Sequence, residues 1–353
     1  MTNGTTAANA SASSSSLGVP ASAGGGYGSL KALVQSAGLL DRSALRALPR
    51  ILLVLALLSS GLVLLAVLQN SWWQLATAVY LAAVLAQVGF LAHDAGHQQI
   101  FRSRRWNDRF GRVVSNGLGG LSYGWWVDKH NRHHRHPNDL QRDPDVGRSV
   151  LAWSDAQADL QRGLSRSIAR NQDRYFFPLL LLEAFSLQAV SIRRLAERKD
   201  HRRLETVLLL AHLAGGIVLL LLLMSPLHAL AFIGVQQGLL GLYLGVSFAP
   251  NHKGMPLADA AWSSDFLRRQ VLTSRNVRGG RLLAAACGGL NYQIEHHLFP
   301  SMPSRNLPRA RQIVRRFCAE HAVSYSETTL FDSYVQVLRY LRAITPSPLP
   351  SRR

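Results

Sequence analysis

Four long stretches of the chain are almost entirely apolar, and they define the architecture that the sequence predicts. They cover residues 51–69, 72–92, 204–224 and 227–249, and each is about 19 to 23 residues long. At a rise of ~1.5 Å per residue, a helix of that length crosses the ~30 Å hydrocarbon core of a bilayer. The pattern therefore predicts an all-α polytopic membrane protein with four transmembrane helices, in two hairpins that turn at Asn70-Ser71 and Ser225-Pro226.

The remaining segments predict helices that do not span the membrane. Residues 112–127 contain four glycines, so we expect an interfacial or re-entrant stretch there. Residues 175–190 are apolar but short, and they predict a single amphipathic helix in the plane of the membrane. Two further amphipathic helices, over about 309–321 and 329–343, are expected to cover a cytosolic helical cap.

The two ends of the chain differ in composition from the rest. Residues 1–28 are mostly Ser, Ala, Gly and Thr, which cannot bury enough apolar surface to offset the entropy of ordering. We expect this tail and residues 346–353 to be disordered, which leaves residues 29–345 as one membrane domain.

The net charge of +19, from 39 Lys and Arg against 20 Asp and Glu, would suggest nucleic-acid binding in a soluble protein. No Lys or Arg, however, lies in the four apolar stretches or in the two turns. Positive residues gather on the cytosolic side of membrane proteins, so both termini and the 98–203 segment are expected inside, in a bacterial cell membrane rather than the endoplasmic reticulum. Nucleic acid is not an expected partner. Cys287 and Cys318 are expected to be reduced thiols.

Seven histidines fall into three short clusters, each close to the inferred cytosolic boundary. The clusters are His93 and His97, then His130, His133 and His134, and finally His296 and His297 with Gln293 just before them. Spacings of three and four residues place side chains on one face of a helix, so each cluster can point at a common centre. Imidazoles without cysteine suit iron, zinc, copper or nickel. The clusters together predict one metal site, with two ions.

The strings around these histidines resemble the membrane fatty acid desaturase family. They are Lys129 to His134, Pro137-Asn138, Asp143-Pro144-Asp145 and Gln293 to Pro300. The third cluster begins with a glutamine, Gln293, instead of a histidine. In this respect it resembles the third cluster of front-end acyl desaturases and of their sphingolipid-desaturase relatives. The resemblance extends over about residues 50–310.

The resemblance implies two iron ions, O2 as co-substrate, and a cis double bond introduced into a long-chain acyl group carried on CoA or a lipid. A sphingolipid desaturase or lipid hydroxylase of the same superfamily stays open, as does, more remotely, a membrane zinc or other metal protein. No H-E-x-x-H zinc motif is present in the sequence. The implied metal ligands are His93, His97, His130, His133, His134, His252, His296 and His297.

Five further residues are candidates beside those ligands. The first is Asn251, which precedes His252. His252 itself, one of the eight implied ligands, follows the fourth apolar stretch as His93 follows the second. Gln293 is expected either to bind metal weakly or to orient a ligand by a hydrogen bond. Asp94 is a candidate acceptor for an imidazole N–H, and so are Asp143 and Asp145, which could instead form only a turn.

The electron donor is expected to be a separate protein, of ferredoxin or cytochrome b5 type, with its reductase. The sequence holds no His-Pro-Gly-Gly haem motif; its one His-Pro, at His136-Pro137, continues with asparagine. Two cysteines cannot hold an iron–sulfur cluster. The basic cytosolic face favours an acidic donor.

Overall fold

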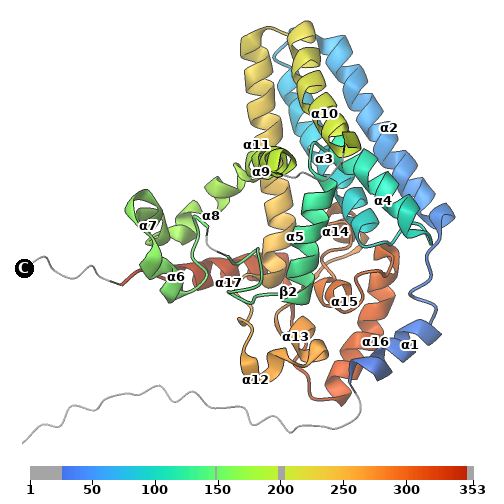
Figure 1. Ribbon diagram of the computed structural model, residues 1–353, viewed down its shortest axis with the longest axis vertical. Coiled ribbons are helices and arrows are strands. Elements are labelled where there is room, and N and C mark those ends of the chain that lie inside the picture. The colour runs from blue at the N-terminus through green and yellow to red at the C-terminus, as the bar shows by residue number, and fades with distance from the viewer. Residues whose placement is uncertain (1–25, 148, 198–202, 348–353) are drawn as a thin grey trace, which may run out of the picture.

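The computed structural model describes residues 26–147, 149–197 and 203–347 (Figure 1). Most of the predicted disordered tails therefore lie outside the described residues. The first helix, α1 (Tyr27–Ser36), begins two residues inside the tail predicted to be disordered. At the other end, Ser347 is held by a 2.6 Å hydrogen bond from its backbone N–H to Asp159 Oδ1. The disorder of the two tails stays a prediction.

Four helices have the length and hydropathy to cross a membrane, as predicted, and they stand together at one end of the molecule (Figure 1). They are α2 (Ala44–Leu68), α3 (Gln74–Gly96), α10 (Arg203–Leu223) and α11 (Pro226–His252). Each hairpin turns where the sequence indicated. Asn70 Oδ1 accepts a 2.8 Å hydrogen bond from the Ser225 backbone N–H and joins the two turns.

Within this bundle, α3 and α11 pack against each other and carry most of the buried surface. By contrast, α2 and α10 expose leucines and valines along most of their length, for example Leu53 and Val207. Apolar side chains on such a surface need a hydrocarbon environment rather than water. The helices α3 and α11 therefore form the interior of the bundle, and α2 and α10 present the apolar surface that suits lipid.

The chain returns from α3 through α4 (Arg104–Arg112), a π-helical turn η1 (Val113–Leu118) and α5 (Tyr123–Arg135). The glycine-rich stretch 112–127 thus comprises η1, a short turn at residues 119–122 and the start of α5. Gly120 has φ +66°, and a Cβ there would meet the His212 ring at 2.6 Å. Glu205, in the first turn of α10, accepts from Arg112 at 3.3 Å and from the Gly124 backbone N–H at 3.2 Å, which fixes the start of α5.

The amphipathic segment predicted as one helix over 175–190 is two helices, so that prediction needs correction. α8 (Gln172–Leu180) and α9 (Glu183–Glu197) meet at an angle of 66°. Pro178 removes a backbone N–H near the end of α8 and weakens the continuing helix. The bend packs against Gly241 of α11, where an added Cβ would lie 2.5 Å from the Leu180 carbonyl oxygen.

The rest of the chain forms the predicted cap of short helices. They are α6 (Asp155–Leu160), α7 (Gly163–Ala169), α12 (Ala260–Ser263), α13 (Phe266–Leu272), α14 (Arg281–Ala286), α15 (Gln293–Leu298), the 3₁₀ turn η2 (Ser304–Asn306), α16 (Leu307–Glu320) and α17 (Leu330–Ala343). The helices α16 and α17 match the two predicted amphipathic helices. The all-α prediction is confirmed except for one small parallel sheet, in which β1 (Asn276–Arg278) pairs with β2 (Glu327–Thr329).

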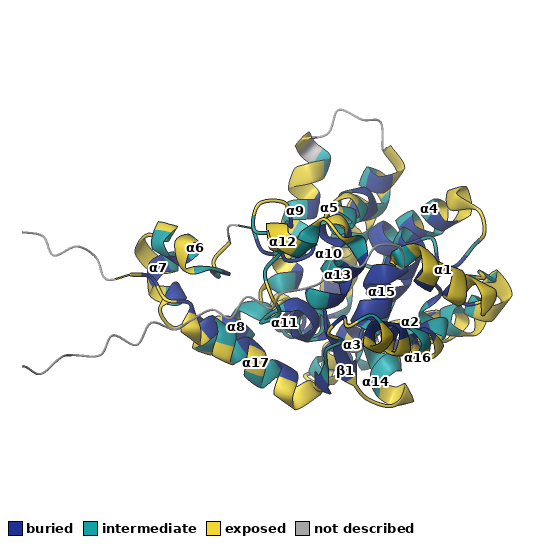
Figure 2. Cartoon of the chain, turned by 90° about the horizontal axis from the view of Figure 1, so that it is seen from below, coloured by how far each residue is buried: buried dark blue, intermediate teal, exposed yellow. Residues whose placement is uncertain are grey.

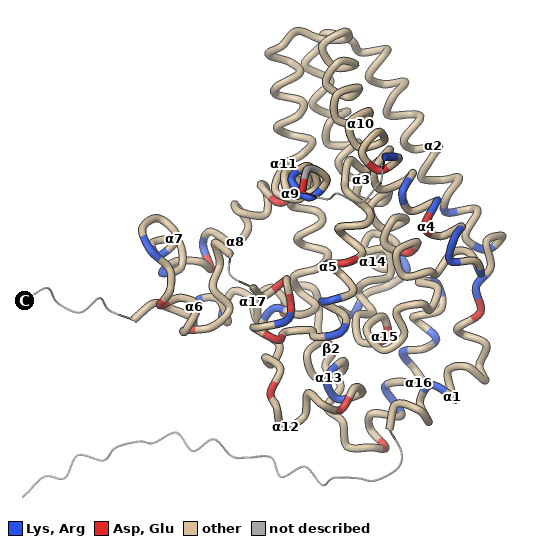
Figure 3. Tube along the Cα trace, viewed as in Figure 1, with Lys and Arg blue, Asp and Glu red and all other residues tan. Residues whose placement is uncertain are grey.

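The helix α15 lies at the centre of the cap and is buried along its whole length (Figure 2). Ile294 and Leu298 on α15 share an apolar cluster with Leu307 and Val314 of α16. On the other side, Tyr27 of α1 donates a 2.9 Å hydrogen bond to the Leu298 carbonyl. Charged residues gather over the cap and leave the long helices largely free of charge (Figure 3). The cytosolic placement of the cap stays a prediction.

Candidate metal centre

All eight histidines predicted as ligands converge at the junction of the bundle and the cap. His93 and His97 come from the end of α3, and His252 is the last residue of α11; α5 and α15 supply the others. Side-chain nitrogens of His93, His97, His130 and His296 lie within 4.8 Å of one another, and so do those of His133, His252 and His297. We call these sets the first and the second histidine group.

His134 lies between the two groups. Its ring stacks on that of His297 at a centroid distance of 4.2 Å and lies 4.5 Å from the ring of His97. Its Nε2 is 3.1 Å from Nε2 of His130. The arrangement is a pair of adjacent ligand sets, which agrees with the two ions predicted from the sequence.

In the second group, each imidazole has its Nδ1 beside an oxygen. Nδ1 of His133 lies 2.9 Å from Asp143 Oδ2, that of His252 lies 3.0 Å from the Thr273 carbonyl, and that of His297 lies 3.0 Å from Gln270 Oε1. Carboxylate and carbonyl oxygens only accept, so Nδ1 carries the proton and Nε2 keeps a free lone pair. This is the tautomer that a metal-binding histidine needs.

Within the described residues, most of the nitrogens on the inner side have no hydrogen-bond donor beside them. Nε2 of His133 faces Nε2 of His252 across 3.3 Å, which places two lone pairs toward each other. Both ring nitrogens of His93 and of His296 are buried without a hydrogen bond, as is Nε2 of His297. Buried polar atoms are normally satisfied, so the residues present fit metal ions at this place.

Burial keeps these imidazoles neutral. Desolvation lowers the pKa of His130, His134, His296 and His297 well below 6.5, and neighbouring imidazoles lower it further. A neutral ring is the form that can donate a lone pair to a cation. The electrostatics and the hydrogen bonds thus favour the same protonation state.

Among the candidate carboxylates, Asp143 takes the orienting role proposed for it. It is buried, binds His133, and also accepts a 2.8 Å hydrogen bond from the Asn138 backbone N–H. Asp145 lies 3.5 Å from His133 Nδ1 but pairs mainly with Lys129. Asp94 pairs with Arg50 at 2.7 Å, and its Oδ1 is 3.6 Å from His93 Nδ1, which is beyond a hydrogen bond.

The two candidate amides lie together beside the second group. Gln293 Nε2 is 2.9 Å from His252 Nε2, and Asn251 Nδ2 is 3.4 Å from Gln293 Oε1. Asn251 also donates to the Ser247 and Leu290 carbonyls at 3.1 Å. Asn251 therefore fixes Gln293, whose amide stands beside the ligand nitrogen of His252.

Several residues that support the site were missed in the sequence. Gln270 and Thr273 hold two ligands, and Arg275 is fully buried, with its guanidinium bonded to the Pro250 and Lys253 carbonyls at the end of α11. They come from the segment Gln270 to Asn276, where a run of four polar residues, 273–276, follows an apolar pair. That polar run was the signal available in the sequence. Polar residues that follow an apolar pair into the interior must find hydrogen-bond partners there, and ligands of a metal site are such partners.

Glu295, between Gln293 and His296, is buried on the opposite side of α15. Its carboxyl accepts from Asn276 Nδ2 at 2.8 Å and from the Tyr325 hydroxyl at 2.7 Å. Burial raises the pKa of Glu295 to about 7, although both hydrogen bonds act to lower it. These contacts fix the rotation of α15 and so the direction of the His296 and His297 side chains.

The chain is similar to known proteins over most of its length. The sequence model of the fatty acid desaturase family matches residues 70–329. An acyl-lipid (9-3)-desaturase of Physcomitrium patens is 31% identical over 280 residues, which cover 76% of this chain and 53% of that protein. A Delta(8)-fatty-acid desaturase of Euglena gracilis is 33% identical over 276 residues, covering 75% of this chain and 66% of that one.

A third relative, the Delta(6)-fatty-acid desaturase fat-3 of Caenorhabditis elegans, is 32% identical over 292 residues, or 78% of this chain and 66% of its own length. The chain thus spans between about half and two thirds of the length of these relatives. The match of the family model covers most of the chain and includes all eight histidines. The chain belongs to the fatty acid desaturase family.

Proposed function

We propose that this chain is an O2-dependent acyl desaturase of the front-end type, which introduces a cis double bond between an existing one and the carboxyl end. The observation that carries the proposal is the convergence of eight imidazoles, in two adjacent groups with His134 between them. The printed names of the relatives, Delta(6), Delta(8) and (9-3) desaturases, support the regiochemical class.

Two irons held here would supply the O2-derived oxidant needed to remove hydrogen from an unactivated methylene. The first group and the second group would each hold one iron, with His134 between them. The chain's own residues prepare the site. Asp143, Thr273 and Gln270 keep protons on the outer ring nitrogens, and Arg275 fixes the end of α11 that carries His252. Burial of seven of the eight ligands, with His130 half-buried, keeps water from side reactions.

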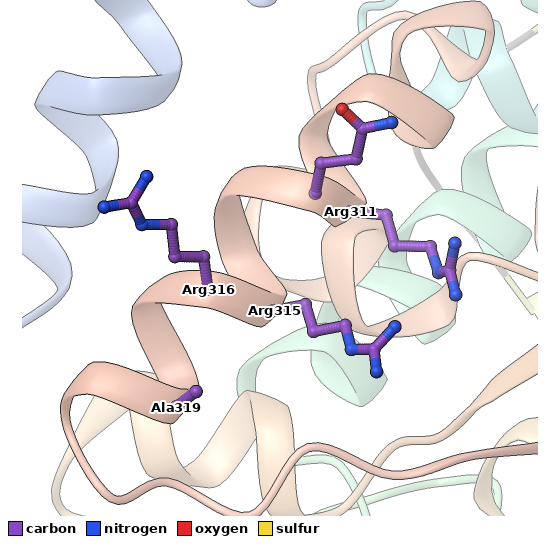
Figure 4. A pocket seen from close by; sticks show the side chains of 5 residues that line it. Arg311, Arg315, Arg316 and Ala319 are labelled. Carbon is purple, nitrogen blue, oxygen red and sulfur yellow. The ribbon is translucent and has the colours of Figure 1, made fainter.

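The electron donor that we propose is a separate acidic redox protein, and α16 offers a surface for it. A hollow of about 340 Å³ on α16 is lined by Arg311, Gln312, Arg315, Arg316 and Ala319 (Figure 4). Arg315 and Arg316 are exposed, and each has an acidic neighbour: Arg316 pairs with Glu320 at 2.7 Å, and Arg315 lies 3.8 Å from Glu327. Arg311 is bonded to Glu327 at 2.8 Å. The inner face of α16 packs on α15, so a donor docked here would lie about one helix diameter from His296 and His297.

Expression in a host that makes saturated and monounsaturated acyl chains tests the proposal. Gas chromatography of its fatty acids should show a new unsaturated species with the wild-type chain and none with His133→Ala or His297→Ala. A hydroxylated product would instead identify a lipid hydroxylase, and a modified long-chain base would identify a sphingolipid desaturase. Stoichiometric zinc without iron in the purified protein would favour the remote alternative.

A further inference from the structure

Two of the four lysines in the sequence lie together beside the second histidine group. The lysines are at 31, 129, 199 and 253. Lys129 on α5 precedes His130, and its ammonium is bonded to Asp145 Oδ1. Lys253 follows His252, and its ammonium donates a 2.8 Å hydrogen bond to the backbone carbonyl of Asp145. Asp145 in turn lies 3.5 Å from Nδ1 of His133.

The carboxylates beside these two lysines do not provide one ion-pair partner for each ammonium group. Asp145 is the ion-pair partner of Lys129, and Asp143 is occupied by His133. For Lys253, the described part of the chain supplies no carboxylate within ion-pair distance; its ammonium lies 4.1 Å from the centre of the Trp153 ring. Glu183 is the next carboxylate nearby and pairs with neither lysine among the described residues. Lys253 thus has N–H donors left for an anionic partner.

The surroundings suit a ligand with a polar head and an apolar chain. The side chains of Lys129 and Asp145 are 30% and 31% exposed, so the cluster reaches the surface. At the nearby bend between α8 and α9, Leu181, Leu182 and Phe185 expose apolar surface on both sides of Glu183. The bend packs on α11 about three turns before Lys253, at Gly241 and Gly245. An amphipathic molecule lying along this edge would have its head at the lysines.

We propose that Lys253, held in place by the Lys129–Asp145 pair, binds the phosphate-bearing head of the acyl substrate. This inference rests on the proposed desaturase function and adds to it the residue that anchors the carboxyl end. Lys253 directly follows His252 in the chain, so its ammonium lies close to the second histidine group. Only a short part of the substrate would therefore separate the bound phosphate from the metal. That short separation is what a double bond counted from the carboxyl end requires. The phosphate is that of a phospholipid, because the pantetheine arm of acyl-CoA would hold its phosphates much farther from the reacting carbons.

Direct binding tests the anchor without any turnover. Three variants of the iron-loaded, purified protein are compared with wild type: Lys253→Gln, which keeps a donor for the Asp145 carbonyl, Lys253→Arg, which keeps the charge, and Lys31→Met, which removes an exposed lysine from α1. Each is titrated anaerobically in detergent with phosphatidylglycerol, acyl-CoA and diacylglycerol that carry the same fluorescent acyl chain. Iron content is measured for every sample.

Lys253→Gln should weaken binding of the phosphate-bearing ligand at least about tenfold and leave diacylglycerol unchanged, because a charge-assisted hydrogen bond is lost. Lys253→Arg should stay within about threefold of wild type, and Lys31→Met should match it. Tighter binding of acyl-CoA than of phosphatidylglycerol by the wild-type protein would overturn the assignment of the phosphate to a phospholipid.

Three outcomes overturn the anchor: equal binding by Lys253→Gln and wild type, an equal loss of affinity for diacylglycerol, or loss of iron from Lys253→Gln. A wild-type protein that binds neither anionic ligand more tightly than diacylglycerol also overturns it. Failure of the desaturase function itself would be seen separately, as the absence of a new fatty acid in the expression host.

Discussion

Gln270 accepts a hydrogen bond at Oε1 from Nδ1 of His297, with 3.0 Å between the two atoms. The orientation of its amide is fixed, because Nε2 donates at 2.9 Å to the His134 carbonyl, which cannot donate. One side chain from α13 thereby sets the tautomer of a ligand on α15 and also holds the backbone of α5. This link between the elements of the site is independent of the metal.

Replacing Gln270 by leucine should therefore weaken iron binding about 10- to 100-fold, the usual effect of removing a residue that orients a metal ligand. The measurement is the iron retained by purified protein against a graded chelator. Gln312→Leu, on the exposed face of α16, is the matched control and should retain iron as wild type does. Equal retention by Gln270→Leu would show that His297 does not need this partner.

A second prediction concerns the bend between α8 and α9. A Cβ at Gly241 would lie 2.5 Å from the Leu180 carbonyl oxygen and 2.9 Å from the Ala184 nitrogen, and backbone atoms cannot rotate away. Gly241→Ala should lower the free energy of unfolding by about 1–3 kcal/mol and increase amide exchange over α8 and α9. Gly234→Ala on the same helix meets no atom within 4 Å, so it should be neutral or slightly stabilising. Identical midpoints of thermal unfolding would refute the packing argument.

The stability of the iron-free protein should fall as the pH falls below about 6.5. In the folded state the pKa of His130, His134, His296 and His297 is lowered by burial, so only the unfolded chain takes up protons in this range. Each such histidine contributes up to about 1.4 kcal/mol per pH unit, present above 6.5 and lost progressively below it.

Glu295 acts in the opposite direction. Burial raises its pKa to about 7, so its contribution is present below the unfolded value of 4.5 and lost as the pH rises through 7. Four histidines outweigh one glutamate, and Glu295→Gln should make the fall in stability on acidification steeper. Denaturation of the apo protein from pH 7.5 to 5.5 measures this, and a flat profile would contradict neutral, buried ligands.

The surface of α16 to which we propose that the electron donor docks should affect only the delivery of electrons when its charge is reversed. Arg315→Glu with Arg316→Glu should reduce turnover with an acidic protein donor at least about tenfold and flatten its salt dependence, because electrostatic steering is lost. Turnover driven by a small chemical reductant should be unchanged. Arg342→Glu, an exposed change on α17, is the control. Equal losses with both reductants would place the defect in the site and not at the surface.

The sequence was sufficient to predict the elements whose signals are local. Apolar length gave the four long helices, and helical spacing joined His130, His133 and His134 on α5. His252 was predicted from its place after an apolar stretch and from the family resemblance. The structure brings it within reach of His133 and His297.

Supporting contacts could not be predicted, because they join residues far apart in sequence. Nothing local indicates that Gln270 reaches His297, that Thr273 faces His252 or that Asn276 meets Glu295. The bend at residues 181–182 was missed because Pro178, which weakens the helix there, was not weighed, and because the close approach of the bend to Gly241 is not visible in the sequence. Asp94, a candidate acceptor for an imidazole N–H, is instead paired with Arg50, 44 positions earlier.

The proposed function is tested most directly with an acyl substrate deuterated on the adjacent carbons where the wild-type product carries its new double bond. Iron-loaded protein, O2 and a reduced donor should give a product that has lost one deuterium from each of the two carbons and gained a cis double bond, as read by mass spectrometry. Loss of a single deuterium with gain of an oxygen atom, or no change in mass while two irons are bound, would contradict the assignment of this chain as a desaturase.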